Sequence, residues 1–297
     1  MIEKTDFRAG YIAIVGCPNV GKSTLMNRLI GAKLSITSKK AQTTRHRIHG
    51  ILTNECCQYV FVDTPGYQTQ HRNALNRAMN RTVSGALNDV DLVLFLVEAN
   101  RWGSDDAEVL KKLPTDTPVI LVASKIDRLA DKGVLLPFMA KLAEQYAFAE
   151  IVPISAERGD NIDTLLKVAA RYLPVAAPIF DPDDLTDRSE RFLAAELLRE
   201  KLFRNLGEEL PYGIAVEIEK FEDVEGVRRI HAAIIVDKDA HKAIVIGKGG
   251  ERMKRIATDA RKEMERLFGG KVWLETWVKV KSGWADDERA LRSLGYE

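Results

Sequence analysis

Apolar residues in the first part of the chain gather in five short runs that are separated by longer amphipathic stretches. The runs cover residues 11–15, 58–63, 91–98, 118–124 and 150–155. Helical patterns cover residues 22–30, 74–87, 105–113, 135–146 and 161–172. In chain order this gives a strand and a helix, a long segment, two strands and then repeated helix–strand units. Near-continuous apolar strands alternating with helices predict an α/β domain whose mostly parallel sheet is covered by helices on both faces.

A stretch with three prolines and an acidic cluster, residues 173–187, separates this pattern from a different one. The later elements are a helix at 188–207, strands at 213–221 and 228–238, a short helix with a glycine-rich turn at 242–250, a helix at 251–269, a strand at 271–281 and a terminal helical segment. This α-β-β-α-α-β order predicts a smaller α+β domain. We therefore expect one domain at 1–175, a linker at 176–187 and a second domain at 188–297.

Composition agrees with two domains and excludes several classes of protein. A chain of 297 residues is long for one compact core. The net charge of +1 means that any nucleic-acid site must be a local patch. The three cysteines include no CxxC pair, so we expect neither disulfides nor zinc, and a reducing cytoplasm fits best. No apolar stretch reaches 18 residues and the first eight residues carry charges, so we expect no membrane span or signal peptide.

Residues 16–23, GCPNVGKS, match the phosphate-binding motif G-x-x-x-x-G-K-[ST] and lie between a predicted strand and a predicted helix. We call this segment the cradle. Glycines let backbone N–H groups close around phosphate oxygens, and the helix N-terminus adds positive potential. We expect Lys22 to reach the β- and γ-phosphates and the Ser23 hydroxyl to bind Mg²⁺. The residues predicted to bind nucleotide here are Gly16, Cys17, Pro18, Asn19, Val20, Gly21, Lys22, Ser23 and Thr24.

The apolar run at 58–63 ends in the tetrapeptide DTPG, which is a second candidate phosphate segment. Alone it would be only a turn, but its position after a strand beside the cradle favours a functional role. The Asp63 carboxylate is predicted to face Mg²⁺, and the Gly66 N–H to meet the γ-phosphate. The predicted nucleotide-binding residues of this segment are Asp63, Thr64, Pro65, Gly66 and Tyr67.

Two later loops carry the candidate for base recognition. The Asp127 carboxylate can accept hydrogen bonds from both the ring N1–H and the exocyclic amine of guanine. Adenine lacks that pair of donors, so the site would reject it. The predicted guanine-binding residues are Ser124, Lys125, Asp127, Ser155, Ala156 and Glu157. Together, the four segments predict a GTPase rather than a general P-loop ATPase, and no acceptor pocket of a metabolic kinase is evident.

A polar and basic segment, residues 35–50, lies between the cradle and the DTPG strand. It is either a solvated loop or a switch segment that orders over the γ-phosphate, and we favour the switch. Thr43 or Thr44 would then complete the Mg²⁺ shell, and we prefer Thr44. The predicted metal ligands are thus Ser23, Thr44 and Asp63. Many GTPases carry a water-orienting glutamine where this chain has Tyr67, so we expect slow intrinsic hydrolysis.

The second domain contains a GxxG turn, Gly247 to Gly250, before a basic helix. Residues 248–262 include six Lys or Arg and two acidic residues, a local balance of +4. Apolar residues at helical spacing predict a buried stripe, formed by Met253, Ile256, Ala260, Met264 and Leu267. The basic face is either solvated or a phosphate contact, and the neighbouring GxxG favours RNA. The predicted RNA-binding residues are Gly247, Lys248, Gly249, Gly250, Arg252, Lys254 and Arg255.

The motifs GCPNVGKS, DTPG, SKID and SAE together resemble the fingerprints of the translation-factor-related GTPases over about half the chain. One departure is Ser124, where that family has an asparagine whose amide braces base and cradle together. We therefore expect weaker nucleotide affinity but retained guanine selectivity. In related proteins an asparagine at the position of Asn19 helps to hold K⁺, which implies K⁺-stimulated turnover here. The predicted catalytic residues are Lys22, Asn19, Thr44 and Gly66.

A GxxG domain after such a GTPase, together with KAQTTRHRI, FVDTPG and VKVKSGWADDERALRSLGY, resembles the Era family of bacterial ribosome-assembly GTPases over nearly the whole chain. The resemblance implies a P-loop GTPase domain followed by a type II KH domain. It also implies Mg²⁺-dependent hydrolysis of GTP to GDP and binding near the 3′ end of 16S rRNA during 30S subunit assembly.

We expect a cytoplasmic monomer, and the resemblance adds peripheral association with the inner membrane. The alternative function is a membrane-associated signalling GTPase that acts in cell-cycle control through a protein partner.

Overall fold

The computed structural model describes residues 7–38, 40, 43–66, 74–207 and 210–296. The chain divides into two compact units. The first unit comprises Met1–Ser35, Thr44–His71 and Met79–Asp187, and the second comprises Ile36–Thr43, Arg72–Ala78 and Arg188–Glu297. The main division follows Asp187, and the second unit also includes two short segments from the earlier part of the chain.

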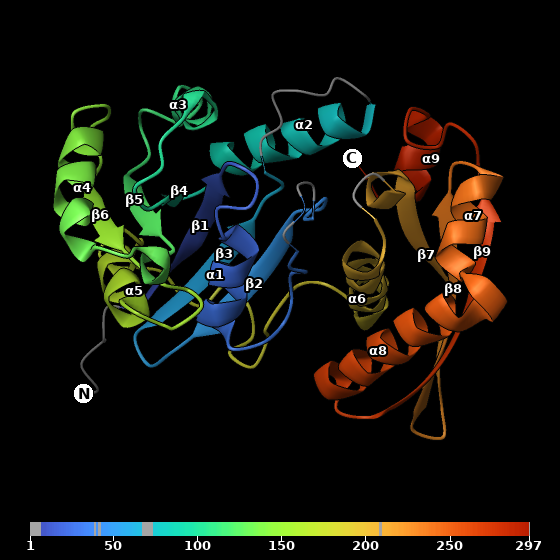
Figure 1. Cartoon of the computed structure of the whole chain (residues 1–297). Helices are drawn as coiled ribbons and strands as arrows, with labels where there is room; N and C mark the ends of the chain where they lie inside the picture. The colour runs from blue at the N-terminus through green and yellow to red at the C-terminus, as the bar shows by residue number, and fades with distance from the viewer. Residues whose placement is uncertain (1–6, 39, 41–42, 67–73, 208–209, 297) are drawn as a thin grey trace, which may run out of the picture. The chain divides into compact units, whose positions relative to one another are not determined.

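The first unit is built on a six-stranded sheet with the order β2-β3-β1-β4-β5-β6 (Figure 1). Its strands are β1 (Arg8–Gly16), β2 (Ile48–Thr53), β3 (Cys57–Asp63), β4 (Leu92–Glu98), β5 (Val119–Ser124) and β6 (Glu150–Pro153). All neighbouring strands run parallel except β2, which pairs antiparallel with β3. The mostly parallel sheet predicted from the apolar runs is therefore confirmed.

Helices cover both faces of this sheet. They are α1 (Lys22–Ile30), α2 (Ala74–Asn88), α3 (Ser104–Leu110), α4 (Leu135–Ala143) and α5 (Ile162–Ala170), with single turns at Ile126–Arg128 and Lys132–Val134. On one face Ala13 and Val15 of β1 belong to an apolar cluster with residues of α2, α3 and α4. The alternate residues Ile12 and Ile14 point to the other face and are also fully buried. Burial on both faces explains why the strands read as continuous apolar runs.

Strand β2 lies at the edge of the sheet and was not among the five apolar runs. Its buried residues, such as Ile48 and Ile51, are interspersed with half-buried ones, so it lacks a continuous apolar signature. The stretch expected to be a linker lies against this edge. Ile51 N donates to Leu185 O at 2.9 Å, and Gln58 Oε1 accepts from Phe180 N at 2.9 Å. Residues 179–185 are therefore held by backbone and side-chain hydrogen bonds of the first unit.

The second unit contains a three-stranded sheet in the order β7-β8-β9, in which β7 and β8 are antiparallel and β8 and β9 are parallel. Its elements are α6 (Glu190–Asn205), a turn at Leu210–Gly213, β7 (Ile214–Val224), β8 (Val227–Val236), α7 (Asp239–Ile246), a turn at Lys248–Gly250, α8 (Glu251–Phe268), β9 (Lys271–Val280) and α9 (Glu288–Ser293). This order confirms the predicted α-β-β-α-α-β domain.

One apolar core joins α6 and α8 to the sheet of the second unit. Leu198 of α6 and Ile256, Ala260 and Met264 of α8 are fully buried and pack with Ile234 of β8. The predicted apolar stripe of α8 is thus the core face of that helix.

The terminal segment closes one end of this unit. The Trp284 side chain is fully buried, and its Nε1 donates to Gly213 O at 3.1 Å. Nearby, Ala285 O accepts from Leu75 N in the first turn of α2 at 3.2 Å. Asp287 begins α9 by accepting the backbone N–H groups of Arg289 and Ala290. Within the described part of the chain, every helix is too short or too polar to span a lipid bilayer.

Candidate functional site

The cradle predicted from the GCPNVGKS motif is a tight loop between β1 and α1. Gly16, the last residue of β1, has φ of 149°, and a Cβ atom there would lie 2.4 Å from Leu96 O. Gly21 precedes α1 with φ of 109°, and Asn19 between them has φ of 64°. Positive φ values at these three residues let the loop turn sharply, and the N-terminus of α1 follows it directly. The backbone therefore has the form that a phosphate chain requires.

Lys22 is folded back onto this loop. Its Nζ donates to Gly16 O at 3.0 Å and to Cys17 O at 2.9 Å. Burial lowers the pKa of the Lys22 ammonium to about 8, and the Asp63 charge partly opposes this shift. A phosphate in the cradle would supply the negative charge that favours the protonated lysine.

The three predicted metal ligands converge from three different segments. Ser23 Oγ of α1 donates to Asp63 Oδ2 at the end of β3 at 2.8 Å. Thr44 Oγ1 lies 2.7 Å from Ser23 Oγ and 3.4 Å from the same Asp63 oxygen. The two neighbouring threonines have different partners, because Thr43 Oγ1 donates to Lys40 O at 2.7 Å. Thr44 is therefore the threonine that faces the cradle.

These oxygens fit a magnesium ion. Asp63 is fully buried, and its Oδ1 has no hydrogen-bond partner among the described residues. Burial raises the pKa of the Asp63 carboxyl, and the Ser35 hydroxyl and Lys22 oppose that rise. A hard cation that binds hydroxyl and carboxylate oxygens would stabilise the ionised form. Among the described residues, no group of three or more His, Cys, Asp or Glu side chains is arranged to hold a metal ion.

Ser35 is a further member of this cluster that sequence reasoning missed. Its Oγ donates to Asp63 Oδ2 at 2.6 Å, which adds a third hydroxyl to the cluster. Asn27 of α1 holds it there, because Asn27 Oδ1 accepts from Ser35 N at 2.9 Å and Asn27 Nδ2 donates to Ser35 O at 2.6 Å. Ser35 belongs to none of the recognised motifs. Its position beside Asp63 follows from the path of the chain after α1, which the sequence does not show.

The DTPG segment lies directly against the cradle. A Cβ atom at Gly66 would come within 2.9 Å of the Cα and N atoms of Pro18, so no other residue fits without backbone movement. Thr64 is fully buried and its Oγ1 donates to Ile14 O of β1 at 2.9 Å. The neighbouring Pro65 is buried as well. Tyr67, which was also predicted to line the nucleotide, lies outside the described residues.

Ser124 connects the base-recognition loop to the cradle. Its Oγ is within hydrogen-bond distance of two carbonyl oxygens, Val20 O at 2.7 Å and Val97 O at 3.1 Å. Val20 lies inside the GCPNVGKS motif, so the short hydroxyl makes a brace to the cradle of the kind expected from an asparagine amide. The expected weakening of nucleotide affinity by Ser124 remains a prediction, with this contact as an argument against a large effect.

The loop that follows β6 orients Asp127 through Ser155. Its Oδ1 accepts from Ser155 Oγ at 2.6 Å, and Ile126 N donates to Ile154 O at 3.2 Å. Lys125 has φ of 60°, and its Nζ contacts Glu98 Oε2 at 2.6 Å. The two loops after β5 and β6 are thus joined, and the Asp127 carboxylate retains an oxygen beyond the one bound by Ser155.

Arg28 is a second residue that the sequence did not reveal. From the last turn of α1 its Nε donates to Ala156 O at 2.8 Å, and its Nη2 donates to Glu157 O. The helix that carries Lys22 and Ser23 therefore also holds the loop predicted to meet the guanine oxygen. An arginine in a helical pattern gives no sign of such a role, because its partners lie far along the chain.

Replacing Ser124 with alanine is expected to weaken GDP and GTP affinity equally, by about tenfold, because Val20 O loses a buried donor. Fluorescence titration with both nucleotides measures this effect. Ser84→Ala, on the exposed part of α2, is the matched control. Ser124→Asn introduces the asparagine that the translation-factor-related GTPases carry at this position. A large gain in nucleotide affinity would show that the serine weakens binding.

The candidate RNA turn joins α7 to α8. Gly247, Gly249 and Gly250 have φ of 73°, 58° and 79°, a conformation that glycine adopts without strain. A Cβ atom at Gly247 would lie 2.7 Å from Arg252 Cβ, whereas Gly249 and Gly250 face open space. The turn is therefore open on the side where its backbone is bare, as an approaching phosphate backbone would require.

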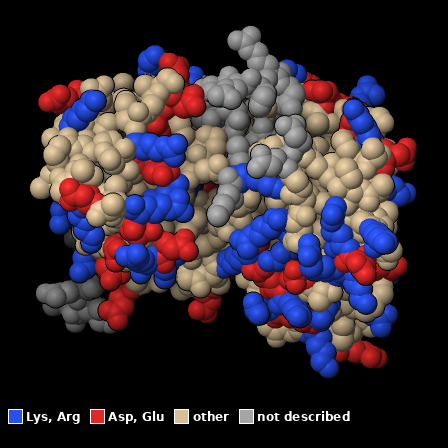
Figure 2. Space-filling model, viewed as in Figure 1, with Lys and Arg blue, Asp and Glu red and all other residues tan. Residues whose placement is uncertain are grey.

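Basic side chains flank this turn. Lys248, Lys254 and Arg255 are exposed, and Figure 2 shows Lys and Arg side chains over α8 with acidic side chains among them. Arg252 differs from the others, because its Nη1 donates to Ile244 O at 2.6 Å and so binds the last turn of α7. Ile244 itself is 44% exposed beside the turn, and no sequence pattern had indicated it.

Comparison with known proteins gives matches along the whole chain. A model of a 50S ribosome-binding GTPase family matches residues 11–125, and a KH domain model matches residues 209–285. GTPase Era of Nitrosomonas eutropha is 60% identical over 296 residues, which cover 100% of both chains. GTPase Era of Chromobacterium violaceum is 55% identical over 293 residues, which cover 99% of each chain.

Two solved structures are similar over nearly their full length. An Aquifex aeolicus Era variant bound to GDP and AlF4⁻ is 40% identical, with a TM-score of 0.95 and coverage of 98% of this chain and 99% of that one. Era in complex with MgGDPNP and nucleotides 1506–1542 of 16S ribosomal RNA is also 40% identical, with a TM-score of 0.94 and the same coverage.

Proposed function

The chain belongs to the Era family of GTPases, and on that premise we propose that it is a switch that hydrolyses GTP and binds 16S rRNA near its 3′ end. The observation that carries the proposal is the full-length similarity to an Era that was crystallised with MgGDPNP and a 16S rRNA fragment. In this proposal residues 1–175 bind and hydrolyse GTP, residues 188–297 bind RNA, and residues 176–187 link them. We further propose that it acts in the cytoplasm, in 30S subunit assembly, as a monomer.

The cradle binds the phosphates of the nucleotide. The loop N–H groups and the N-terminus of α1 face the phosphate oxygens, and Lys22 adds a positive charge to the β- and γ-phosphates. Ser23, Thr44 and Asp63 would hold Mg²⁺, which neutralises phosphate charge when bound. The close approach of Gly66 to the cradle supports a contact between its N–H and the γ-phosphate. We propose all of these residues as the phosphate and metal site.

The base is read by the loops after β5 and β6. Asp127 accepts the two guanine donors, while Ser155 fixes the carboxylate and Ser124 braces the loop against the cradle. The backbone at Ala156, held by Arg28, faces the guanine oxygen. Because a purine without the donor pair would leave a carboxylate unpaired, this arrangement selects guanine over adenine.

The RNA is bound at the open glycine turn. Lys248, Lys254 and Arg255 contact phosphates, and the bare backbone at Gly249 and Gly250 lets the RNA approach closely. The full-length match to an RNA-bound Era favours this role over a signalling GTPase with a protein partner. Crosslinking in cells followed by sequencing of the attached RNA tests it. Enrichment of the 3′ region of 16S rRNA is expected, and crosslinks spread evenly over cellular RNA would contradict the proposal.

Potassium is expected to accelerate hydrolysis through Asn19. The left-handed backbone at this residue places it in the curl of the cradle, and its side-chain oxygen can ligate a monovalent cation beside the phosphates. Steady-state GTP turnover in matched Na⁺ and K⁺ buffers measures the effect, and at least a fivefold higher rate in K⁺ is expected, by comparison with the larger effect of an arginine finger. Asn19→Ala should abolish the difference. Equal rates of the native protein in both buffers would overturn the assignment.

A further inference from the structure

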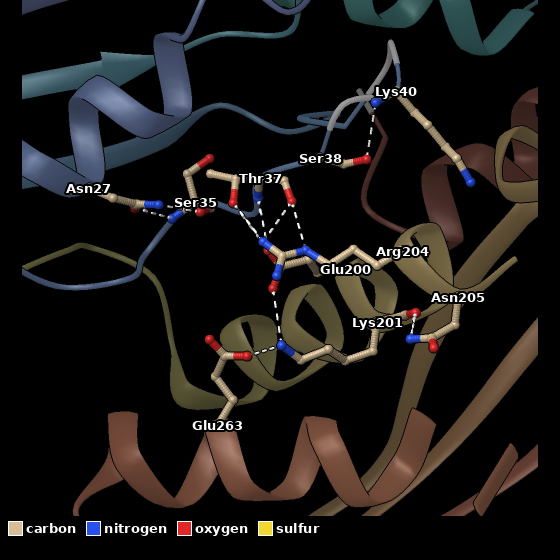
Figure 3. Close-up of polar contacts among 10 residues, drawn as sticks. All are labelled: Asn27, Ser35, Thr37, Ser38, Lys40, Glu200, Lys201, Arg204, Asn205 and Glu263. Carbon is tan, nitrogen blue, oxygen red and sulfur yellow. Dashed lines mark hydrogen bonds and ion pairs between the residues drawn. The ribbon is translucent and has the colours of Figure 1, made fainter. Parts of the chain in front are cut away.

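The segment that precedes Thr44 is bound to helix α6. Residues Ile36–Thr43 belong to the second compact unit, although the chain on both sides belongs to the first. Figure 3 shows Thr37 facing Glu200 and Arg204 of α6. Glu200 Oε1 accepts from Thr37 N at 3.1 Å and from Thr37 Oγ1 at 3.3 Å. Both donors of one switch residue thus share a single buried carboxylate.

Arg204 also forms hydrogen bonds with Thr37. Its Nε and Nη2 donate to Thr37 O at 3.2 and 3.1 Å, and Nη2 also contacts Thr37 Oγ1 at 3.0 Å. The arginine is itself fixed by Glu200, with 2.7 Å between Nη2 and Oε1. Thr37 is therefore held through its N–H, its carbonyl and its hydroxyl, which is more than a solvated loop would show.

Lys40 and Thr43 also form hydrogen bonds with α6 or with the residue that follows it. Lys40 Nζ donates to Phe203 O at 2.7 Å and to Leu206 O at 2.5 Å, carbonyls at the C-terminal end of the helix, where a cation is favoured. The buried Arg199 donates from Nη2 to Thr43 O at 2.5 Å, beside Thr44. The segment is thus tied to α6 at both ends.

We propose that Arg204, Glu200 and Arg199 of α6 are positioning residues for GTP binding and hydrolysis. By holding Thr37 and Thr43 they limit the conformations of the chain next to Thr44, which reduces the entropy lost when Thr44 is fixed beside Ser23 and Asp63. This inference rests on the proposed function, because it assigns a role to Thr44 at the γ-phosphate. GDP has no γ-phosphate, so its affinity does not depend on the contacts that Arg204, Glu200 and Arg199 make with Thr37 and Thr43.

Arg204→Ala in the full chain tests the proposal, with Arg191→Ala as the matched control. Both arginines are exposed on α6, but Arg191 donates to Ile218 O of β7, whereas Arg204 donates to Thr37. Loss of the Arg204 contacts is expected to weaken affinity for a non-hydrolysable GTP analogue about fivefold and to lower the single-turnover rate, with GDP affinity changed less than twofold. Arg191→Ala should leave all three quantities unchanged.

A double-mutant cycle makes the test independent of folding effects. Thr37→Val removes the hydroxyl that Arg204 contacts. The effects of Thr37→Val and Arg204→Ala on the ratio of GTP-analogue to GDP affinity should therefore be less than additive in the double variant. Arg204→Lys, which retains the positive charge and one donor nitrogen, should restore part of the ratio. Equal losses for both nucleotides, or an unchanged ratio, would overturn the proposal. Failure of the proposed function would instead appear in the native protein, as absent GTP hydrolysis or absent RNA binding.

Discussion

Replacing Asp127 with asparagine is expected to lower GTP affinity at least a hundredfold and to create affinity for xanthosine triphosphate. In the proposed site the Asp127 carboxylate accepts two guanine donors, whereas an amide presents one acceptor and one donor. The guanine amine would then meet an N–H group, and a buried polar pair would be lost. Xanthine carries a carbonyl oxygen in place of that amine and matches the amide. Competition titrations with GTP and xanthosine triphosphate measure the inversion of preference.

The control for this experiment lies four residues further along the chain. Asp131→Asn makes the same chemical change at an exposed position, where Asp131 Oδ1 accepts only from Gly133 N at 2.7 Å. It should leave both affinities unchanged. Retention of GTP preference by the Asp127 variant would show that the base is read elsewhere. Because Ser155 Oγ can also donate to an amide oxygen, the loop is expected to keep its conformation in the variant.

The cradle was predictable because its chemistry is contiguous in sequence. Gly16, Gly21 and Lys22 belong to one loop whose backbone geometry follows from the positions of its glycines. Gly66 was predictable as well, although the reason for its glycine, contact with Pro18, is visible only in the structure. Local motifs therefore reveal the candidate phosphate site, because a short loop specifies its own shape.

Ser35 and Arg28 were not predictable for the opposite reason. Each acts through partners that folding brings from elsewhere, Asp63 for Ser35 and the carbonyl oxygens of Ala156 and Glu157 for Arg28. A single serine or arginine has no spacing that indicates such a partner. The contacts of Thr37 and Thr43 with α6 belong to the same class, since they join residues more than 150 positions apart.

In the second domain, the helical period of α8 predicted its buried stripe correctly but could not separate the roles of its basic residues. Arg252 was grouped with the RNA-binding residues, yet its guanidinium donates to Ile244 O. We therefore expect Arg252 to contribute mainly by holding the turn, and the exposed Lys248 and Arg255 to contribute through charge. Sequence gives the face of a helix, while the partner of each long side chain depends on the neighbouring element.

Reversing two of these charges, with Lys248→Glu and Arg255→Glu in one variant, is expected to weaken binding of the proposed 16S rRNA fragment about a hundredfold at moderate salt. The reason is electrostatic, because each residue that neutralises a phosphate releases counterions. The slope of log affinity against log salt should therefore fall by about two. Filter binding over a series of salt concentrations gives both quantities, and GTP affinity in the same variant should be unchanged, because neither residue belongs to the cradle.

The same number of charges can be reversed far from the turn. Arg229 and Lys271 are exposed near one end of the sheet, where Lys271 pairs with Val227, whereas α7 follows the other end of β8 at Val236. A ten-residue strand spans about 30 Å, which exceeds the screening length at physiological salt. Arg229→Glu with Lys271→Glu should therefore leave the salt slope unchanged. If both double variants lost affinity equally, binding would follow the overall charge of the domain, and the glycine turn would not be the RNA site.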